Sequence, residues 1–157
     1  VGEFLVRSPT LFKGYLNKPE LTRAAFADGW YMTGDAGYRD RDGLLYLVDR
    51  TKDMIITGGE NVYSTEVESA ISKHPGVSQV AVIGLPDSQW GERVVAIVIP
   101  AADACLDTED IIAHCRRLIA AYKVPKQVVL ANQLPMTPSG KILKATLRKQ
   151  FREMAET

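Results

Sequence analysis

Two charged segments in the first third of this 157-residue chain carry residue types that can hold a nucleotide. Asp35 directly follows Gly34, where the backbone can approach a ligand closely, and a carboxylate can accept hydrogen bonds from both hydroxyls of a ribose. Arg50 lies in the charged stretch 49–53 and can donate to ribose or phosphate oxygens through its planar guanidinium. Taken singly, each has a plainer interpretation, a turn aspartate and an exposed charged connector.

Two glycine-containing segments further along the chain suggest a second kind of chemistry. Gly58 and Gly59 remove side chains over two residues, which serves either a simple turn or a ligand that passes close to bare backbone. Lys141 follows Gly140 just before a basic helical segment, where an ammonium can offset charge on a reacting phosphate or carboxylate. The segment is not a Walker A loop, because the upstream glycine is absent and Ile142 replaces Ser or Thr.

Three motifs, in this order and spacing, are specific where each alone is weak. They are Tyr-x-Thr-Gly-Asp at 31–35, Asp-Arg-x-Lys-Asp-Met-Ile-Ile-x-Gly-Gly-Glu-Asn-Val-Tyr-x-x-Glu-Val-Glu at 49–68, and Pro-x-x-x-x-Gly-Lys at 135–141. Together they resemble the adenylate-forming (AMP-binding) superfamily, which includes acyl-CoA synthetases, luciferases and peptide-synthetase adenylation domains. The resemblance covers essentially the whole chain and is closest to the C-terminal portion of fatty-acid–CoA ligases.

The resemblance implies a domain organisation. Residues 1–48 correspond to the end of a large N-terminal domain, residues 49–53 to a hinge, and residues 54–157 to a small mobile α+β domain with a central sheet flanked by helices. Lys52 matches the hinge position. The chain begins at Val1 without a signal-like segment, and we expect it to be a piece of a larger cytoplasmic protein.

The resemblance also implies roles for the adenylation residues. Asp35 and Arg50 match the residues that hold the ribose of ATP or AMP, and Lys141 matches the catalytic lysine that bridges the substrate carboxylate and the nucleotide phosphate. ATP, CoA and Mg²⁺ are the implied cofactors. The phosphate-binding loop, the acyl pocket and the magnesium-binding glutamate of the family have no counterpart here, so we expect no metal site in this chain and no ligase activity from it alone.

The CoA side of the resemblance is less complete. Gly58 and Gly59 match a turn that lines the channel of the pantetheine thiol, and Trp90 resembles a tryptophan near that channel. Tyr122 and Lys126 resemble residues that meet the CoA nucleotide, although Val124 stands where some relatives have a cation. A carrier-protein phosphopantetheine is the alternative acceptor. The pocket that selects the carboxylic acid lies outside this sequence, and overall similarity favours medium to long fatty acids as the substrate.

Charge is unevenly distributed along the chain, although 19 basic and 19 acidic residues cancel. Residues 1–115 carry a net charge of −7, and residues 116–152 carry nine basic and no acidic side chains. Such a basic region can bind CoA phosphates or, as an alternative, nucleic acid, but no RNP-type aromatic motif or helix-turn-helix accompanies it. Cys105 and Cys115 form no metal-binding pattern and predict free thiols in a reducing compartment.

The elements that must position these residues follow from hydrophobic patterning. Apolar runs predict strands over 4–7, 44–48, 54–57, 77–85, 94–99 and 126–130. Helices are predicted over 19–26, from an N-cap at Ser64, from Thr108, and over 142–151. From residue 54 the order is roughly β-α-β-β-α-β-α, typical of a compact α+β domain. The first 48 residues do not belong to its core.

Overall fold

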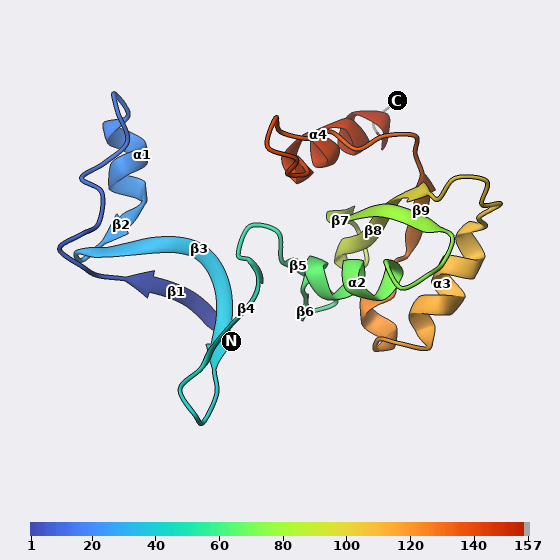
Figure 1. Cartoon of the computed structure of the whole chain (residues 1–157), viewed down its shortest axis with the longest axis horizontal. Helices are drawn as coiled ribbons and strands as arrows, with labels where there is room; N and C mark the ends of the chain where they lie inside the picture. Colours follow the sequence, from blue (N-terminus) through green and yellow to red (C-terminus); the bar gives the residue numbers. More distant parts are fainter. Residues whose placement is uncertain (156–157) are drawn as a thin grey trace. The chain divides into compact units, whose positions relative to one another are not determined.

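The computed structural model describes residues 1–155 and divides into two compact units, Val1–Lys52 and Asp53–Thr157. The first unit contains β1 (Gly2–Val6), α1 (Pro19–Ala24), β2 (Phe26–Ala27), β3 (Trp30–Arg39) and β4 (Leu45–Arg50). Strand β3 is central: β1 pairs along one edge, and β2 and β4 pair with opposite ends of the other (Figure 1). All three pairings are antiparallel. This sheet positions Asp35 on β3 and Arg50 on β4.

An aromatic cluster at one end of the first unit's sheet packs Phe12, Tyr15, Phe26 and Tyr31 with ring centroids 5.1–5.5 Å apart. Hydrogen bonding to Tyr15 raises the pKa of Tyr31 above the ordinary tyrosine value, so the Tyr31 phenol is neutral at physiological pH. The cluster fixes the chain that leads from β1 into β3, because its members come from the loop after β1, from β2 and from β3 itself.

The second unit is a five-stranded sheet with helices on both faces. Its elements are β5 (Ile55–Thr57), β6 (Glu60–Val62), α2 (Ser64–Ile71), β7 (Val77–Asp87), β8 (Gly91–Pro100), α3 (Thr108–Arg116), the 3₁₀ turn η1 (Ala121–Lys123), β9 (Gln127–Leu130) and α4 (Lys144–Ala155). Strand β8 is central, with β7 antiparallel along one edge. Along the other edge, β5 pairs at Gly91 and β9 pairs in parallel over Val95–Val98.

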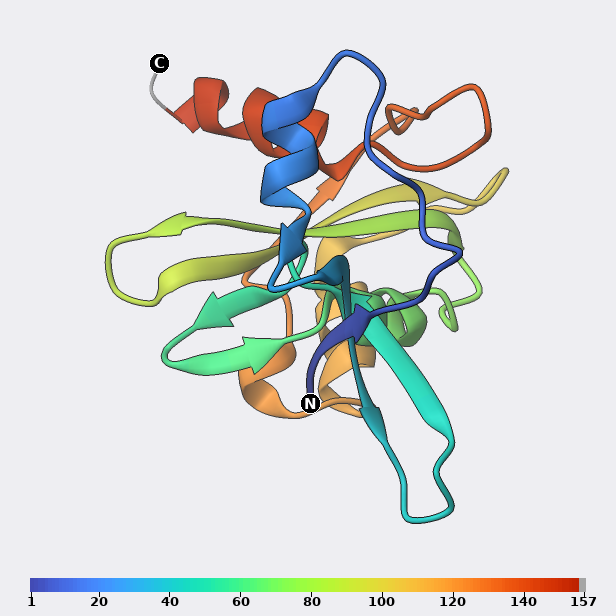
Figure 2. The ribbon, with the colours of Figure 1, turned by 90° about the vertical axis from the view of Figure 1, so that its left-hand side faces the viewer.

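The two faces of this sheet hold separate apolar cores. Val94, Ala96 and Val98 of β8 face Val67 and Ile71 of α2 together with two residues of α3, Ile111 and Cys115. The alternate residues Val95 and Ile97 face Leu147 of α4 on the opposite side. Figures 1 and 2 show α4 on one side of the sheet and α2 and α3 on the other. Both faces of β8 are therefore buried, which explains its uninterrupted apolar sequence.

The predicted α+β class is confirmed, but β2 and β3 of the first unit were not predicted, and two local predictions in the second unit were wrong. Strand β6 was not predicted, because the Gly58–Gly59 pair was interpreted as the end of a strand rather than as the turn of a hairpin. Ser64 is not the N-cap of α2: that position is Tyr63, in extended conformation, and Ser64 is the first helical residue. The Ser64 hydroxyl instead accepts a hydrogen bond from Lys144 Nζ at 2.7 Å.

Candidate functional site

Asp35 and Arg50 form an ion pair in the first unit. The β3–β4 register sets the two residues opposite each other, and Arg50 Nε lies 2.7 Å from Asp35 Oδ1. The Asp35 side chain is 32% exposed and that of Arg50 is 54% exposed, so both keep hydrogen-bonding capacity toward solvent. A carboxylate beside a planar donor fork suits a vicinal diol with a nearby phosphate.

The backbone before Asp35 is held by several hydrogen bonds. Gly34 has a φ of +72°, its N–H donates to Glu3 Oε1 at 2.8 Å, and its carbonyl accepts from Thr51 N at 2.9 Å. The Asp35 N–H donates to Thr33 Oγ1 at 3.0 Å, and the same hydroxyl donates to the Phe4 carbonyl at 2.7 Å. These contacts hold the backbone of Gly34 and Asp35 to β1 and to the residue after β4, and so position the Asp35 side chain.

The Gly58–Gly59 segment is a two-residue hairpin turn between β5 and β6. Both glycines have positive φ, +58° and +83°, as a type I′ turn requires. The Gly58 N–H donates to the Trp90 carbonyl at 2.8 Å, and a Cβ at Gly58 would lie 3.0 Å from Trp90 Cε3. The indole therefore packs against bare backbone at Gly58, whereas space around Gly59 is open.

Lys126 also lies at this surface, so the structure brings together four of the five residues predicted for CoA: Gly58, Gly59, Trp90 and Lys126. Its ammonium lies 5.3 Å from the centroid of the Trp90 ring, a cation–π distance. Lys126 also lines a cleft of about 560 Å³ with Arg116. Tyr122 lies on the neighbouring turn η1, where the Lys123 ammonium is 5.6 Å from its ring.

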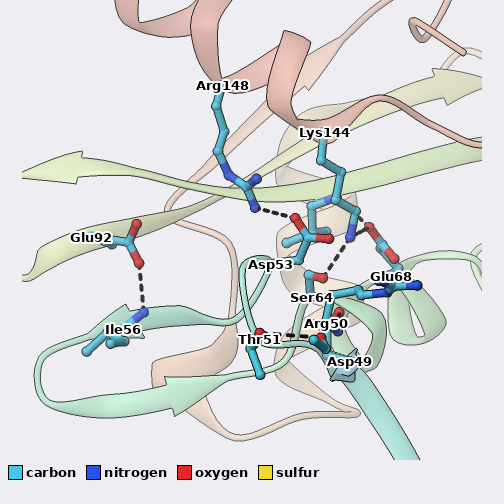
Figure 3. Close-up of polar contacts among 12 residues, drawn as sticks. Asp49, Arg50, Thr51, Asp53, Ile56, Ser64, Glu68, Glu92, Lys144 and Arg148 are labelled. Carbon is cyan, nitrogen blue, oxygen red and sulfur yellow. Dashed lines mark hydrogen bonds and ion pairs between the residues drawn. The ribbon is translucent and has the colours of Figure 1, made fainter. Parts of the chain in front are cut away.

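Glu92 supports the same surface and was not singled out by sequence reasoning. Its carboxylate accepts a hydrogen bond from Ile56 N at 2.8 Å, which ties β5 to β8 next to the glycine turn (Figure 3). A Cβ on Gly84 would lie 2.9 Å from this carboxylate, so glycine there makes room for it. Its position directly after Trp90 and Gly91 was the available sequence signal.

Lys141 stands on a rigid turn that leads into α4. The Thr137 N–H donates to the Lys141 carbonyl at 2.8 Å, and the Lys141 N–H donates to Thr137 Oγ1 at 3.0 Å. Gly140 takes a φ of +80° within this turn. The Lys141 side chain is exposed, and its ammonium makes no ion pair with any residue in the described part of the chain. The turn thus presents a free cation on a fixed backbone.

Part of the basic C-terminal region is neutralised inside the second unit. Lys123, Lys144 and Arg148 pair with Glu66, Glu68 and Asp53 at 2.7, 2.7 and 2.8 Å. The hydrogen bond with Glu66 raises the pKa of Lys123 above the ordinary lysine value. These three cations are committed to internal contacts, which leaves less of the positive charge for a nucleic acid.

The described residues contain neither a candidate metal site nor a candidate membrane-spanning helix. Between residues 1 and 155, no three His, Cys, Asp or Glu side chains gather in a way that could hold a metal ion. In the same part of the chain, no helix is long and apolar enough to cross a membrane.

The chain is similar to known CoA ligases and CoA synthases. Residues 66–141 match the AMP-binding enzyme C-terminal domain. The chain is 51% identical over 150 residues to the long-chain-fatty-acid–CoA ligase FadD13 of Mycobacterium tuberculosis and 47% identical over 150 residues to a feruloyl-CoA synthase of an Amycolatopsis species. Each match covers 96% of this chain and 30% of the relative, so the chain spans about a third of the length of these curated relatives.

A solved structure shares the fold over nearly the entire chain. The ATP-bound MatB crystal structure from Rhodopseudomonas palustris has a TM-score of 0.89 and 38% sequence identity, covering 98% of this chain and 31% of that protein. The sequence match and the structural match therefore extend over the same residues, including both compact units.

Proposed function

The chain belongs to the adenylate-forming (AMP-binding) enzyme family, whose C-terminal portion it matches, and on that premise we propose that it is part of an ATP-dependent acyl-CoA ligase. The observation that carries the proposal is the division of chemistry between loops of the second unit. Lys141 is a free cation on one rigid turn, and the Gly58–Gly59 turn with Trp90 forms a separate surface of bare backbone. A two-step ligase needs one such loop for each step.

In the first step, a carboxylate oxygen of the acid attacks the α-phosphorus of ATP, and pyrophosphate leaves. The Lys141 ammonium offsets the repulsion between the two anions as they approach. Asp35 accepts hydrogen bonds from the ribose hydroxyls, and Arg50 holds Asp35 while donating to the nucleotide. Mg²⁺ would neutralise the ATP phosphates, and we assign its ligands to residues outside this chain, since the described residues offer no metal cluster.

In the second step, the thiol of CoA attacks the acyl carbonyl and AMP leaves. Gly58 and Gly59 give the pantetheine arm a path along the backbone, with the Trp90 indole as one wall. Lys126, beside its cleft, and Tyr122 on η1 are assigned to the nucleotide end of CoA. We favour CoA over a carrier protein because the relatives at 51% and 47% identity are named as CoA ligase and CoA synthase.

The assignment extends to the organisation of the whole protein. Residues 1–48 are the end of its large domain, residues 49–53 are the hinge, which contains the exposed Lys52, and residues 54–157 are a small domain that rotates between the two steps. The reaction takes place in the cytoplasm. The chain alone is expected to form no acyl-CoA, because the acyl pocket and the phosphate-binding loop lie elsewhere.

The test compares Lys141→Ala and Gly59→Leu in the full-length protein, with ATP–pyrophosphate exchange and CoA transfer to preformed acyl-adenylate measured separately. Lys141→Ala should lower the rate of ATP–pyrophosphate exchange about 10²–10³-fold and leave the rate of CoA transfer unchanged. Gly59→Leu should lose transfer and keep exchange. A panel of fatty and aryl acids in the exchange assay identifies the substrate class.

Two control variants separate these roles from damage to the fold. Lys73→Ala removes an exposed lysine elsewhere on the second unit and should change neither rate. Gly59→Ala carries the same positive-φ strain as the leucine variant without its bulk. If both test variants keep both activities, the assignment of the two loops is wrong even if the family is right.

A further inference from the structure

Helix α4 anchors two elements of the second unit through ion pairs that are largely buried. Arg148 Nη2 lies 2.8 Å from Asp53 Oδ1, and these side chains are only 19% and 13% exposed. One turn earlier, Lys144 Nζ lies 2.7 Å from Glu68 Oε1 and donates to Ser64 Oγ at 2.7 Å. Figure 3 shows Arg148 and Lys144 extending from the same helix toward Asp53 and Glu68.

Asp53 lies at the boundary between the two compact units of the chain. It is the first residue of the second compact unit, and the residue before it is Lys52, which is exposed. Arg148 is 95 residues away in sequence, so the pair closes a long loop between the start of the unit and its last helix. The pair thereby connects the chain to α4 two residues before the sheet begins at Ile55.

The helix that provides Arg148 is packed against the sheet. Leu147 is buried at 3% exposure in the core beneath α4, and Phe151 packs against the same core. Glu68, the partner of Lys144, also accepts a hydrogen bond from Val82 N of β7 at 2.8 Å. Asp53 is therefore linked to α4 through Arg148, and α4 is linked to α2 and β7 through Glu68. Helix α4 begins three residues after Lys141.

We propose that Arg148 is a positioning residue that shortens the hinge assigned above from residues 49–53 to residues 49–52: by holding Asp53 it keeps this residue out of the rotation, so that Asp53, Lys141 and the Gly58–Gly59 turn move as one body. This inference rests on the proposed two-step function. Its physical reason is geometric, because catalytic groups displaced by about 1 Å can lose on the order of 10²-fold in rate. A pivot that extended into residues 53–54 would let both loops arrive at variable positions.

The experiment uses the full-length protein with Arg148→Ala, Asp53→Asn, the double variant, and the conservative Arg148→Lys. Arg152→Ala is the matched control, since Arg152 is an exposed arginine one turn further along α4. The first readout is amide hydrogen exchange of a peptide spanning residues 53–57, followed by mass spectrometry. The second is kcat and KM for pyrophosphate exchange and for CoA transfer.

Arg148→Ala should accelerate exchange in the 53–57 peptide at least fivefold and lower kcat of both half-reactions on the order of tenfold, with KM for ATP within twofold of wild type. The double variant should have the same kcat values as Arg148→Ala, because both single changes remove the same contact. Arg148→Lys should recover part of kcat. Arg152→Ala should match wild type in every readout.

Two results would overturn the inference. One is faster exchange at 53–57 with unchanged kcat, which would make the pair a stabilising contact only. The other is an Arg148→Ala variant indistinguishable from Arg152→Ala. If Arg148→Ala does not fold, Asp53→Asn and Arg148→Lys decide by the same criteria. If the wild-type protein catalyses neither half-reaction, the proposed function is refuted. The amide hydrogen exchange measurement would still report whether Arg148 holds Asp53.

Discussion

Arg50 and Asp35 stand directly across from each other on β4 and β3, with the guanidinium Nε 2.7 Å from the carboxylate. The pair is partly exposed and lies where β4 ends beside the middle of β3, and Asp35 directly follows Gly34, which has a positive φ. Because the partners are accessible, their mutual attraction adds little to stability. Their arrangement is better explained as pre-orientation of a carboxylate toward a ligand.

Replacing Arg50 should therefore weaken nucleotide binding more than it weakens the fold. In the full-length protein, Arg50→Ala should raise KM for ATP about tenfold, the loss expected for a hydrogen bond to a charged group. The KM of Arg50→Lys should lie between those of wild type and Arg50→Ala, because an ammonium lacks the planar fork of a guanidinium. Arg41→Ala, an exposed arginine of the β3–β4 loop, serves as the control. A lowered melting temperature with unchanged KM would contradict this expectation.

The two glycines of the β5–β6 turn should differ in their tolerance of a methyl group. Gly59→Ala meets only the cost of positive φ, about 1–2 kcal/mol. Gly58→Ala has the same cost and also places a Cβ 3.0 Å from Trp90 Cε3, so the indole must move. Urea unfolding should show the larger loss for Gly58→Ala, together with altered Trp90 fluorescence. Equal losses would mean that the indole is free to shift.

Glu92 should support the surface formed by the Gly58–Gly59 turn and Trp90, through its hydrogen bond to the backbone of β5. Glu92→Ala removes the acceptor of the Ile56 N–H and should lower the free energy of unfolding by about 1–2 kcal/mol. It should also reduce CoA transfer more than pyrophosphate exchange. Glu92→Gln keeps a carbonyl acceptor in place and is the matched control. Equal effects of the two substitutions would show that charge, and not the hydrogen bond, is what matters there.

Lys123 and Glu66 should give an alkaline dependence of stability. The hydrogen bond to Glu66 raises the pKa of Lys123 above 10.5, the ordinary value. A group with a higher pKa in the folded state stabilises while the pH is below its unfolded pKa, and this contribution disappears as the pH passes the folded value. Wild type should thus exceed Glu66→Gln by a constant amount from about pH 7 to 9 and converge with it above about 10.5.

The control for this pH series is Glu109→Gln. Glu109 is an exposed carboxylate in the first turn of α3, as Glu66 is in the first turn of α2, so helix-dipole effects are matched. Its stability difference from wild type should show no change in the alkaline range. A parallel change in both variants would assign the effect to the helix termini.

Local sequence signals predicted most of the second unit because they act over short distances. The turn at Pro75 and Gly76 and the periodic apolar residues of α2 and α3 located those helices, and the β-rich runs located β7 and β8. Which face each residue of Val94–Ile99 would occupy was beyond the pattern, because a strand buried on both sides shows no alternation.

The candidate site divides in the same way. Lys141, Gly58 and Gly59 stand out as candidates from motifs, because the pattern that marks them consists of adjacent residues. The contacts of Arg148 with Asp53 and of Lys144 with Ser64 and Glu68 could not, since they join residues 76 to 95 positions apart and depend on how α4 packs. A serine before a helical pattern predicts a cap. At Ser64, packing of α4 replaced that local role with a long-range one.

The parallel pairing of β9 with β8 has a consequence for biosynthesis. The β7–β8 hairpin is local and can form as soon as Pro100 has left the ribosome, but the Val95–Val98 edge obtains its partner only when Gln127–Leu130 follows. In that interval, a hydrophobic strand with strong aggregation tendency has an open edge. Chains that terminate between these points should therefore depend on chaperones, and a nonsense mutation there should yield insoluble protein.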